Sequence, residues 1–325
     1  PNVDHGNGKR TRKPPAWHKD YDFAEENHGA YFSCADYVEQ SPITKEEAMA
    51  RTDSEKWKAA IQEELDSHKK YNTWNVVPRP EKRKVIDSKW VFKVKTNMDG
   101  TAERYKARLV AKGFQSSDYK ETYSPVAKLT TFRVLMSIAN HYDYEIVQMD
   151  VKTAFLNGTL EEEIYMNLPE DMYDSNLVCK LGKSIYGLKQ SPKNWNTRFN
   201  VFMEKEGFQN SKHDTCLYIR NSENSVLYVL LYVDDIIILG NNKTSLGQFQ
   251  NKLKSEFEMT VLDNINYLGL IVERNRESCE MKIHQTKYLQ EVMNKFNMSN
   301  CKGISTPIDK GLNLDRAQSE EGITT

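Results

Sequence analysis

The residues best suited to chemistry are two adjacent aspartates, Asp234 and Asp235, which interrupt a strongly apolar stretch. The flanking segments, 226–233 and 236–239, have the composition of buried strands, so the pair is expected to form a hairpin turn at the end of a buried sheet. Asp is common in turns, and forming this turn could be the only role of the pair. Two adjacent carboxylates nevertheless repel each other unless a cation, such as a hard metal ion, neutralises them.

Asp150 is the natural third carboxylate. It ends the segment 144–150, which alternates as a strand does, although the same residue could simply cap the next segment of the chain. Three carboxylates at the ends of two neighbouring strands are what two-metal phosphoryl or nucleotidyl transfer requires. The spacing alone does not establish that the two strands are neighbours.

The surrounding segments mix strand and helix patterns without a regular βαβ period, which predicts an α+β fold with an antiparallel sheet covered by helices. Thr52 and Glu55 have the spacing of a capping box and predict that a helix begins there and runs to Lys70. Further helices are expected at 131–142, 193–206 and 244–256, and strands at 74–77, 144–151, 164–166 and 216–219.

A second hairpin is predicted at 89–109, with its turn at 97–100. Its apolar side chains alternate with lysines and arginines, so one face is apolar and the other cationic. From 79 to 112 there are eleven Lys and Arg against four Asp and Glu, whereas the whole chain carries a formal charge of -1. Nucleic acid would therefore have to be bound by local patches, and the cationic face could equally be an ordinary solvated strand face.

Composition excludes several classes of protein. The five cysteines are widely spread with no C-x-x-C spacing, which argues against a disulfide framework or zinc ribbon and suits a reducing compartment. The most apolar window, 226–239, is too short and too charged for a transmembrane helix, and the start lacks a secretory segment. We expect a soluble intracellular protein, or a fragment of one, that begins with a polar, Pro-broken linker.

Seven segments occur in a recognisable order: KWVFKVK (89–95), RYKARLVAKGF (104–114), ETYSPVA (121–127), QMDVKTAFLNG (148–158), EIYM (163–166), IYGLKQSP (185–192) and LYVDD (231–235). In these segments the chain resembles the reverse transcriptases of copia-type LTR retrotransposons, with the insect copia element as the nearest likeness. The resemblance runs from about 57 to 307. It implies a right-hand polymerase with fingers, palm and partial thumb.

The resemblance also implies boundaries. A linker at 1–51, where integrase joins polymerase, would precede a reverse transcriptase domain at 52–311, and a disordered tail would follow at 312–325. Within the domain, the fingers would span about 74–145, the palm about 146–270 and the partial thumb about 271–311.

Position within the motifs implies roles for individual residues. Asp150, Asp234 and Asp235 would be the catalytic, metal-binding aspartates, with the Val151 carbonyl as a further ligand of two Mg²⁺ ions, for which Mn²⁺ could substitute. Phe155 would be the aromatic gate that excludes a ribose 2′-OH, and its alternative interpretation is a core aromatic.

The remaining nucleotide-binding residues implied are Lys95, Lys106, Arg108, Tyr186 and Gly187. The first three would grip the triphosphate, and the last two would contact template and nucleotide. Leu268 and Gly269 resemble the primer grip, although an ordinary glycine bend would look the same. Trp195 and Tyr232 also fall at family positions, where packing is as good an explanation as contact.

The implied activity is RNA-directed DNA synthesis, with an RNA or DNA template–primer and dNTPs as partners and no membrane. The setting would be cytoplasmic, in virus-like particles, and the RNase H and integrase regions of the same polyprotein are expected but absent from this chain. Two alternatives stay open: a degenerate or domesticated copy that binds nucleic acid without synthesis, and a purely structural module of a particle polyprotein. A short loop at 115–117 and the missing end of the thumb keep the first of these open.

Overall fold

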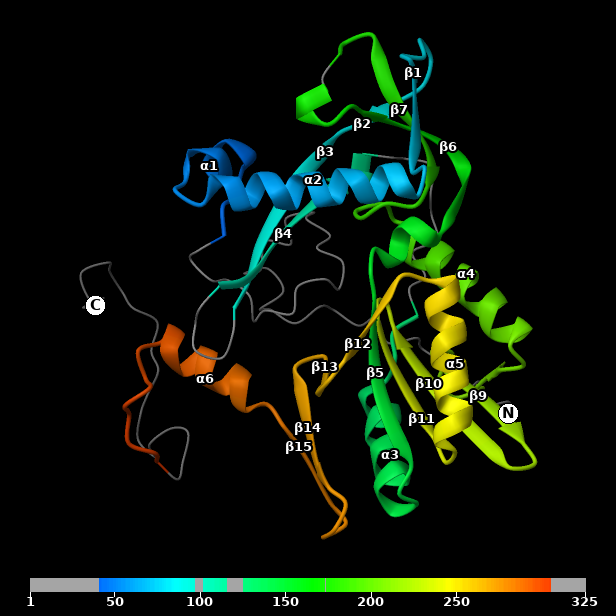
Figure 1. Ribbon diagram of the computed structural model, residues 1–325. Helices are drawn as coiled ribbons and strands as arrows, with labels where there is room; N and C mark the ends of the chain where they lie inside the picture. The colour runs from blue at the N-terminus through cyan, green and yellow to red at the C-terminus, as the bar shows by residue number, and fades with distance from the viewer. Residues whose placement is uncertain (1–40, 97–101, 116–124, 173, 305–325) are drawn as a thin grey trace, which may run out of the picture.

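The computed structural model describes residues 41–96, 102–115, 125–172 and 174–304. These residues form helices and largely antiparallel sheets, and the α+β prediction is confirmed (Figure 1). Several predicted features lie wholly or partly outside the described residues: the linker up to residue 40, the hairpin turn at 97–100, the short loop at 115–117, most of the motif at 121–127 and the tail at 312–325.

A six-stranded antiparallel sheet forms the centre of the lower half of the molecule (Figure 1), in the order β12-β5-β11-β10-β9-β8. Its strands are β5 (Glu145–Val151), β8 (Gln209–Asn210), β9 (Leu217–Ser222), β10 (Ser225–Tyr232), β11 (Asp235–Gly240) and β12 (Met259–Leu262). The hairpin predicted within 226–239 is therefore β10 and β11, paired antiparallel from Leu227↔Gly240 to Tyr232↔Asp235.

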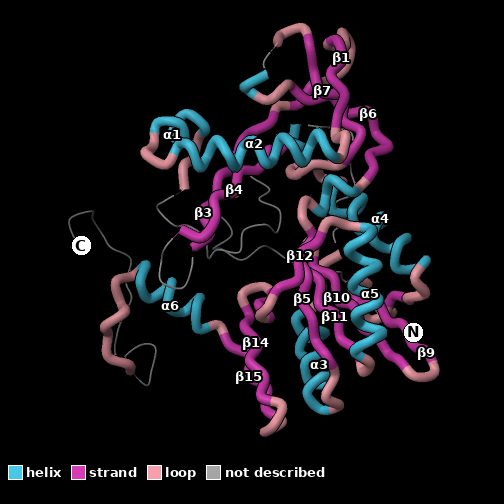
Figure 2. Tube along the Cα trace, in the orientation of Figure 1, coloured by secondary structure: helices cyan, strands magenta, loops and turns pink. Residues whose placement is uncertain are grey.

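Helices cover both faces of this sheet, which explains the continuous apolar sequence of β11. Ile236 and Ile238 pack with side chains of α4 (Ser191–Lys205) and α5 (Lys243–Glu256). Ile237 and Leu239 point to the other face, where they pack with α3 (Leu129–His141). Each of these helices begins within two residues of its predicted start, and all three predictions are confirmed (Figure 2).

The upper half contains the remaining predicted strands, at 74–77 and 164–166, and the cationic hairpin. β1 (Trp74–Pro78), β2 (Val85–Ile86), β6 (Thr159–Asn167) and β7 (Leu177–Lys183) form a four-stranded sheet in the order β1-β7-β6-β2. The cationic hairpin is β3 (Ser88–Thr96) and β4 (Ala102–Ala111). Its predicted apolar face is confirmed, because Phe92 and Leu109 are buried, and Phe92 packs edge-on against Trp57 of α2 (Ser54–Lys70) at 5.3 Å.

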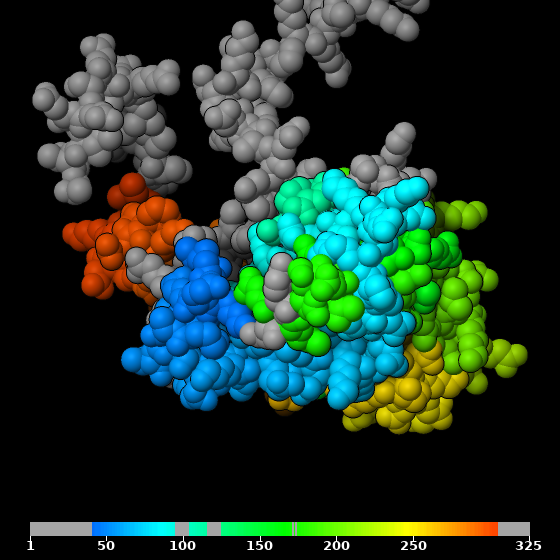
Figure 3. Space-filling view, turned by 90° about the horizontal axis from the view of Figure 1, so that it is seen from above, coloured from blue at the N-terminus to red at the C-terminus, as the bar shows by residue number. Residues whose placement is uncertain are grey.

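A three-stranded sheet and a last helix complete the described chain. The sheet contains β13 (Ile265–Tyr267), β14 (Leu270–Asn275) and β15 (Glu280–His284), and α6 (Thr286–Lys295) follows it. Seen from above, α6 (orange) projects at one side, while the segments from α1 onward (blue to cyan) cover the face turned to the viewer (Figure 3). No helix among the described residues is long and apolar enough to cross a membrane.

Two expectations about the start of the fold were wrong. Residues 45–50, expected to belong to a linker without packed structure, form α1 (Lys45–Ala50), whose Ala48 is fully buried in the same core as Trp57. The capping residue of α2 is Asp53 instead of Thr52, and it makes no side-chain capping bond. The real side-chain cap is Thr44, whose hydroxyl accepts a hydrogen bond from the Glu47 amide at 3.2 Å, so a second Thr-x-x-Glu pattern begins a helix eight residues earlier than expected.

Glu64 attaches α2 to the hairpin from inside the core. The residue is 7% exposed, and its carboxylate accepts a hydrogen bond from the backbone amide of Leu109 at 3.1 Å. It also lies 3.4 Å from Nε2 of the buried His68. Because Leu109 is only 1% exposed, its N–H has no access to water if this acceptor is removed.

Glu64→Leu is therefore expected to lower the free energy of unfolding by about 1–3 kcal/mol, the cost of a buried donor without a partner. Glu64→Gln retains an acceptor oxygen and should cost less. Urea unfolding followed by circular dichroism measures both. The matched control is Glu63→Leu, since Glu63 is exposed and pairs with Arg104 at the surface. Equal losses for positions 63 and 64 would contradict this role.

Candidate active site

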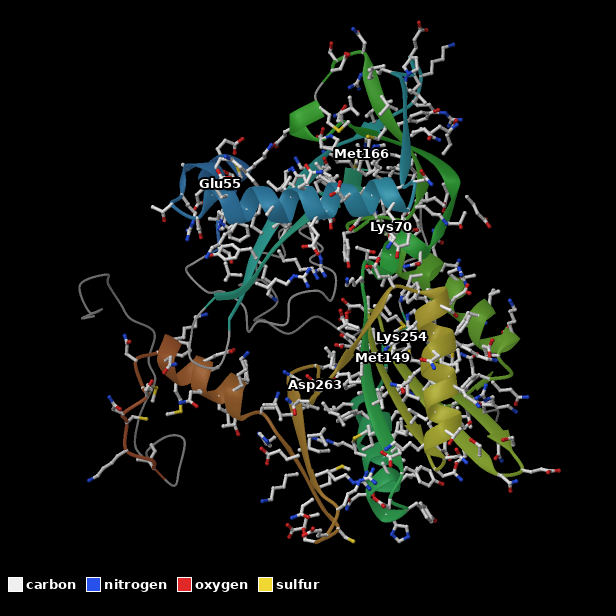
Figure 4. All side chains as sticks on the ribbon, viewed as in Figure 1. Glu55, Lys70, Met149, Met166, Lys254 and Asp263 are labelled. Atoms are coloured by element: carbon white, nitrogen blue, oxygen red, sulfur yellow. The ribbon has the colours of Figure 1, made fainter. Side chains whose placement is uncertain are left out.

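Strand pairing brings two of the three aspartates directly together. β5 and β11 are antiparallel neighbours, and their register sets Asp150 opposite Asp235. Asp234 lies in the two-residue turn between β10 and β11, and its carbonyl accepts a hydrogen bond from the Val151 amide at 2.8 Å. The three aspartates predicted to form one site therefore do lie at the same end of the central sheet. In Figure 4 this region can be found from the label of Met149, the residue before Asp150 on β5.

The turn that carries Asp234 is held in a costly conformation. Val233 has a φ of 55°, a left-handed value that is unfavourable for a β-branched residue. Trp195 of α4, itself 2% exposed, donates a hydrogen bond from Nε1 to the Val233 carbonyl at 2.6 Å. Trp195 was expected either to pack or to contact a substrate. The buried indole favours packing, and its hydrogen bond fixes the turn.

A guanidinium from the hairpin lies beside the aspartates. Arg108 of β4 is 4.0 Å from Asp234, between side chains that are each about one-third exposed. Its guanidinium also lies over the Tyr186 ring, 4.4 Å from the ring centre. Burial opposes the charge of Arg108, but the surrounding Tyr186, Asp234, Glu64 and Asp150 outweigh it and raise its pKa. Arg108 is thus a permanent cation facing the acidic end of the sheet.

Phe155 and Tyr186 form the next layer of the site. Their rings meet edge to face with 4.8 Å between centres, so Arg108 contacts Tyr186, and Tyr186 in turn contacts Phe155. Burial raises the pKa of Tyr186, which keeps its hydroxyl neutral. Phe155 is only 1% exposed and belongs to the core between the central sheet and the helices α4 and α5. The structure therefore places it near the site but packed as a core aromatic would be.

Gly187 joins β4 to the segment that carries Tyr186. The amide of Ala111 donates a hydrogen bond to the Tyr186 carbonyl at 2.8 Å. Gly187 has a φ of 89°, and a Cβ there would come within 2.0 Å of the Ala111 carbonyl oxygen. Only glycine fits, because a side chain would push the two backbones apart. This close approach fixes Arg108 and Tyr186 relative to each other.

The other predicted binding residues are less closely grouped. Lys106 is half-buried on β4, two residues from Arg108. The backbone of Lys95 pairs with Arg104, but its side chain lies outside the described residues. Tyr232, which ends β10, is half-buried with its pKa raised first by burial and then by Asp234 and Asp235.

Leu268 and Gly269 form the two-residue turn between β13 and β14. Their φ values are 53° and 78°, and the flanking residues Tyr267 and Leu270 are paired. Positive φ at both turn positions is typical of a type I′ hairpin, which normally favours Asn-Gly. Leu268 is therefore a strained choice, and its side chain is 40% exposed. The sequence allowed an ordinary glycine bend here, and the structure shows a two-residue turn with positive φ at both positions.

Sequence reasoning missed Gln148. This β5 residue is 1% exposed and donates a hydrogen bond from Nε2 to Oδ1 of Asp235 at 3.0 Å. The available signal was a polar residue inside a buried strand, on the same side as Asp150. A buried amide requires partners, so the pattern indicated a polar network near the aspartate.

The donor set of the site suits a hard cation, but its side chains are not gathered around one. Carboxylate and carbonyl oxygens are the ligands that Mg²⁺ prefers. Within the described ranges, no group of three or more His, Cys, Asp or Glu side chains is arranged closely enough to hold a metal ion. Gln148 and Arg108 instead lie beside Asp235 and Asp234, respectively.

Replacing Leu268 by Asn is expected to raise the free energy of unfolding by up to about 1 kcal/mol, because Asn tolerates the left-handed conformation. Urea unfolding compares the variant with the wild type. Ile265→Asn in the same hairpin, at a residue with ordinary φ, is the control and should destabilise. A loss of stability for Leu268→Asn would show that the leucine side chain makes contacts worth more than the backbone strain.

Comparison with known proteins identifies the class. Residues 71–310 match the family model described as "Reverse transcriptase (RNA-dependent DNA polymerase)", and the chain belongs to this family. The predicted family is thereby confirmed, and the division into fingers, palm and partial thumb stays a prediction. A solved telomerase from Candida albicans aligns with 76% of this chain and 54% of its own, at 10% identity and a TM-score of 0.39, which is too low to support an argument.

Among curated proteins, the chain is similar to the retrovirus-related Pol polyprotein from transposon TNT 1-94 of Nicotiana tabacum, at 39% identity over 86% of this chain. It is also similar to that from transposon RE1 of Arabidopsis thaliana, at 36% over 83%, and to the Ty1-MR1 Gag-Pol polyprotein of Saccharomyces cerevisiae, at 29% over 82%. The chain spans 22%, 19% and 16% of these three relatives, about a fifth of their length. The expected nearness to the insect copia element stays a prediction.

Proposed function

We propose that this chain is the polymerase part of a copia-type retrotransposon Pol polyprotein and that it adds dNTPs to a primer on an RNA or DNA template. The main observation that supports this proposal is the β5–β11 register, which sets Asp150 opposite Asp235 with Asp234 in the adjoining turn. Family membership supports the reaction class. The related proteins are named as Pol polyproteins of transposons, which supports the setting.

In this proposal Asp150, Asp234 and Asp235, with the Val151 carbonyl, hold two Mg²⁺ ions. Bound there, the ions would activate the primer hydroxyl and neutralise charge on the leaving oxygen. The primer 3′-oxygen forms a bond to the α-phosphorus of the dNTP, its proton leaves to solvent, and the bond to pyrophosphate breaks. The protein contributes position and charge, because little covalent chemistry is left to its side chains.

Arg108 is proposed to pair with the triphosphate of the incoming nucleotide, together with Lys106 and Lys95. Its place beside Asp234 supports this role, because a guanidinium that neutralises carboxylates can exchange them for phosphate oxygens. Tyr186 and Gly187 would contact template and nucleotide, Phe155 would limit the space for a 2′-hydroxyl, and the Leu268–Gly269 turn would hold the primer end.

Template and primer would be bound largely through their phosphates, so binding should weaken as salt rises. We further propose that the chain acts in the cytoplasm, inside particles, and that RNase H and integrase act from other regions of the same polyprotein. A copy that binds nucleic acid without synthesis, and a structural module of a particle, are the two rival outcomes of a primer-extension test.

The deciding test is primer extension on poly(rA)/oligo(dT) with dTTP and Mg²⁺. The wild type should extend the primer, and Asp234→Asn should lose at least about 100-fold of the rate, because one metal-binding charge is removed. Asp66→Asn, which changes an exposed aspartate of α2, is the matched control and should extend normally.

Duplex binding without extension by the folded wild type would support the degenerate copy instead, and neither binding nor extension would support the structural module. Extension that survives in Asp234→Asn would remove this residue from the metal site.

Arg108→Gln should raise the KM for dTTP about 10-fold or more, since a charge-assisted contact worth roughly 1.5–3 kcal/mol is lost. Arg104→Gln is the control, because Arg104 lies on the same strand but pairs with Glu63 at the surface. Steady-state kinetics with varied dTTP give both values. Similar increases for the two variants would mean that Arg108 contributes only to the general positive field of the hairpin.

A further inference from the structure

Gln148 connects two parts of the site that are far apart in the sequence. Its Nε2 donates to Oδ1 of Asp235 and to the backbone carbonyl of Asn266, both at 3.0 Å. Its Oε1 accepts a hydrogen bond from the Asn266 amide at 2.7 Å. Asn266 lies in β13, two residues before Leu268. One buried amide therefore contacts both an aspartate and the hairpin that carries the Leu268–Gly269 turn.

Strand geometry puts Gln148 on the correct side of the sheet. It pairs with Ile237 and lies diagonally from Asp235, on the face that α3 and the β13–β14 hairpin cover. Both donors of its amide group are used, and its oxygen has a donor. A flipped amide would set its oxygen against two acceptors, so the side chain has one favourable orientation.

The contact with Asn266 uses backbone atoms alone. Gln148 binds the N–H and the C=O of the same residue, as a neighbouring strand would, so the link does not depend on the side chain at position 266. A displacement of β13 has to move the amide of Gln148 or break two hydrogen bonds. Because the residue is 1% exposed, water cannot replace them at low cost.

We propose that Gln148 is a positioning residue that sets the distance and orientation between the Leu268–Gly269 turn and the carboxylate of Asp235. This inference rests on the proposed function. If the turn holds the primer end and Asp235 holds a metal ion, Gln148 determines where the primer 3′-hydroxyl lies relative to that ion. A purely structural role would stabilise the hairpin without linking it to catalysis.

Two substitutions at position 148 separate the contacts. Gln148→Met keeps the volume and removes all three hydrogen bonds. Gln148→Glu keeps an acceptor for the Asn266 amide but faces Asp235 and the Asn266 carbonyl with a carboxylate. The control is Asn241→Ala, which removes a side-chain acceptor of the Val226 amide at the opposite end of the sheet.

In primer extension, both variants should lower kcat about 10- to 100-fold, the scale expected for misplaced reacting groups, and should leave the KM for dTTP within about 2-fold. The KM for primer–template should rise in Gln148→Met and rise less in Gln148→Glu, which retains one anchor to β13. Combining Gln148→Met with Leu268→Ala should give less than the product of the two single effects, because both act through the same turn.

A second measurement needs neither metal nor turnover. In EDTA, fluorescence anisotropy with a labelled poly(rA)/oligo(dT) duplex should show about 3- to 10-fold weaker binding for Gln148→Met and no change for Asn241→Ala. Circular dichroism and urea unfolding confirm that each variant is folded.

The outcomes distinguish this inference from the proposed function. A wild type that extends primers, with a folded Gln148→Met of unchanged kcat and duplex affinity, overturns the inference alone. Fully independent effects of Gln148→Met and Leu268→Ala also overturn it. A wild type that binds duplex but does not extend overturns the proposed function, and the anisotropy comparison still decides the inference. A wild type that does neither overturns both.

Discussion

The pairing of β5 with β11 is the constraint on which the site depends. It sets two carboxylates opposite each other at the end of a sheet whose two faces are both covered by helices, and it leaves a third in the adjoining turn. Like charges at such a place are costly unless neighbouring groups offset them. The surrounding polar contacts offset that cost: the Gln148 amide donates to Asp235, and Arg108 approaches Asp234. The Trp195 indole holds the turn itself.

A second set of contacts carries the cationic hairpin to the same place. Its strand β4 uses the amide of Leu109 to bind Glu64 of α2 and the amide of Ala111 to bind the Tyr186 carbonyl. These two amides lie close to the strand segment that projects Arg108. At the C-terminal end of α2, Lys70 (labelled in Figure 4) pairs with Glu258, which also pairs with Lys152 just after β5. Helix α2 therefore contacts both the hairpin and the central sheet.

Local sequence patterns predicted most helices and strands, but they could not predict which distant strands pair with each other. Alternation and apolar runs located both hairpins and the helices of the sheet, because burial on one or two faces determines the side-chain period. The spacing from Asp150 to Asp235 did not reveal that the strands are adjacent, since register depends on the whole sheet. The same limit hid the partners of Gln148, which lie 87 and 118 residues away. For α1, the prediction used the Thr-x-x-Glu pattern at 52–55, whereas the hydrogen bond from the Glu47 amide to Thr44 and the burial of Ala48 show that a helix already begins at the earlier pattern.

The contact between Gly187 and the end of the hairpin restricts how the molecule can move. The backbones of Ala111 and Gly187 touch, and a Cβ on Gly113 would come within 2.2 Å of the Gly187 carbonyl oxygen, so there is no free space at this junction. Rotation about the base of the hairpin would require these backbones to separate. Any movement of the hairpin relative to the aspartates would therefore have to come from bending and twisting along β3 and β4, because the base of the hairpin is packed against the Gly187 backbone.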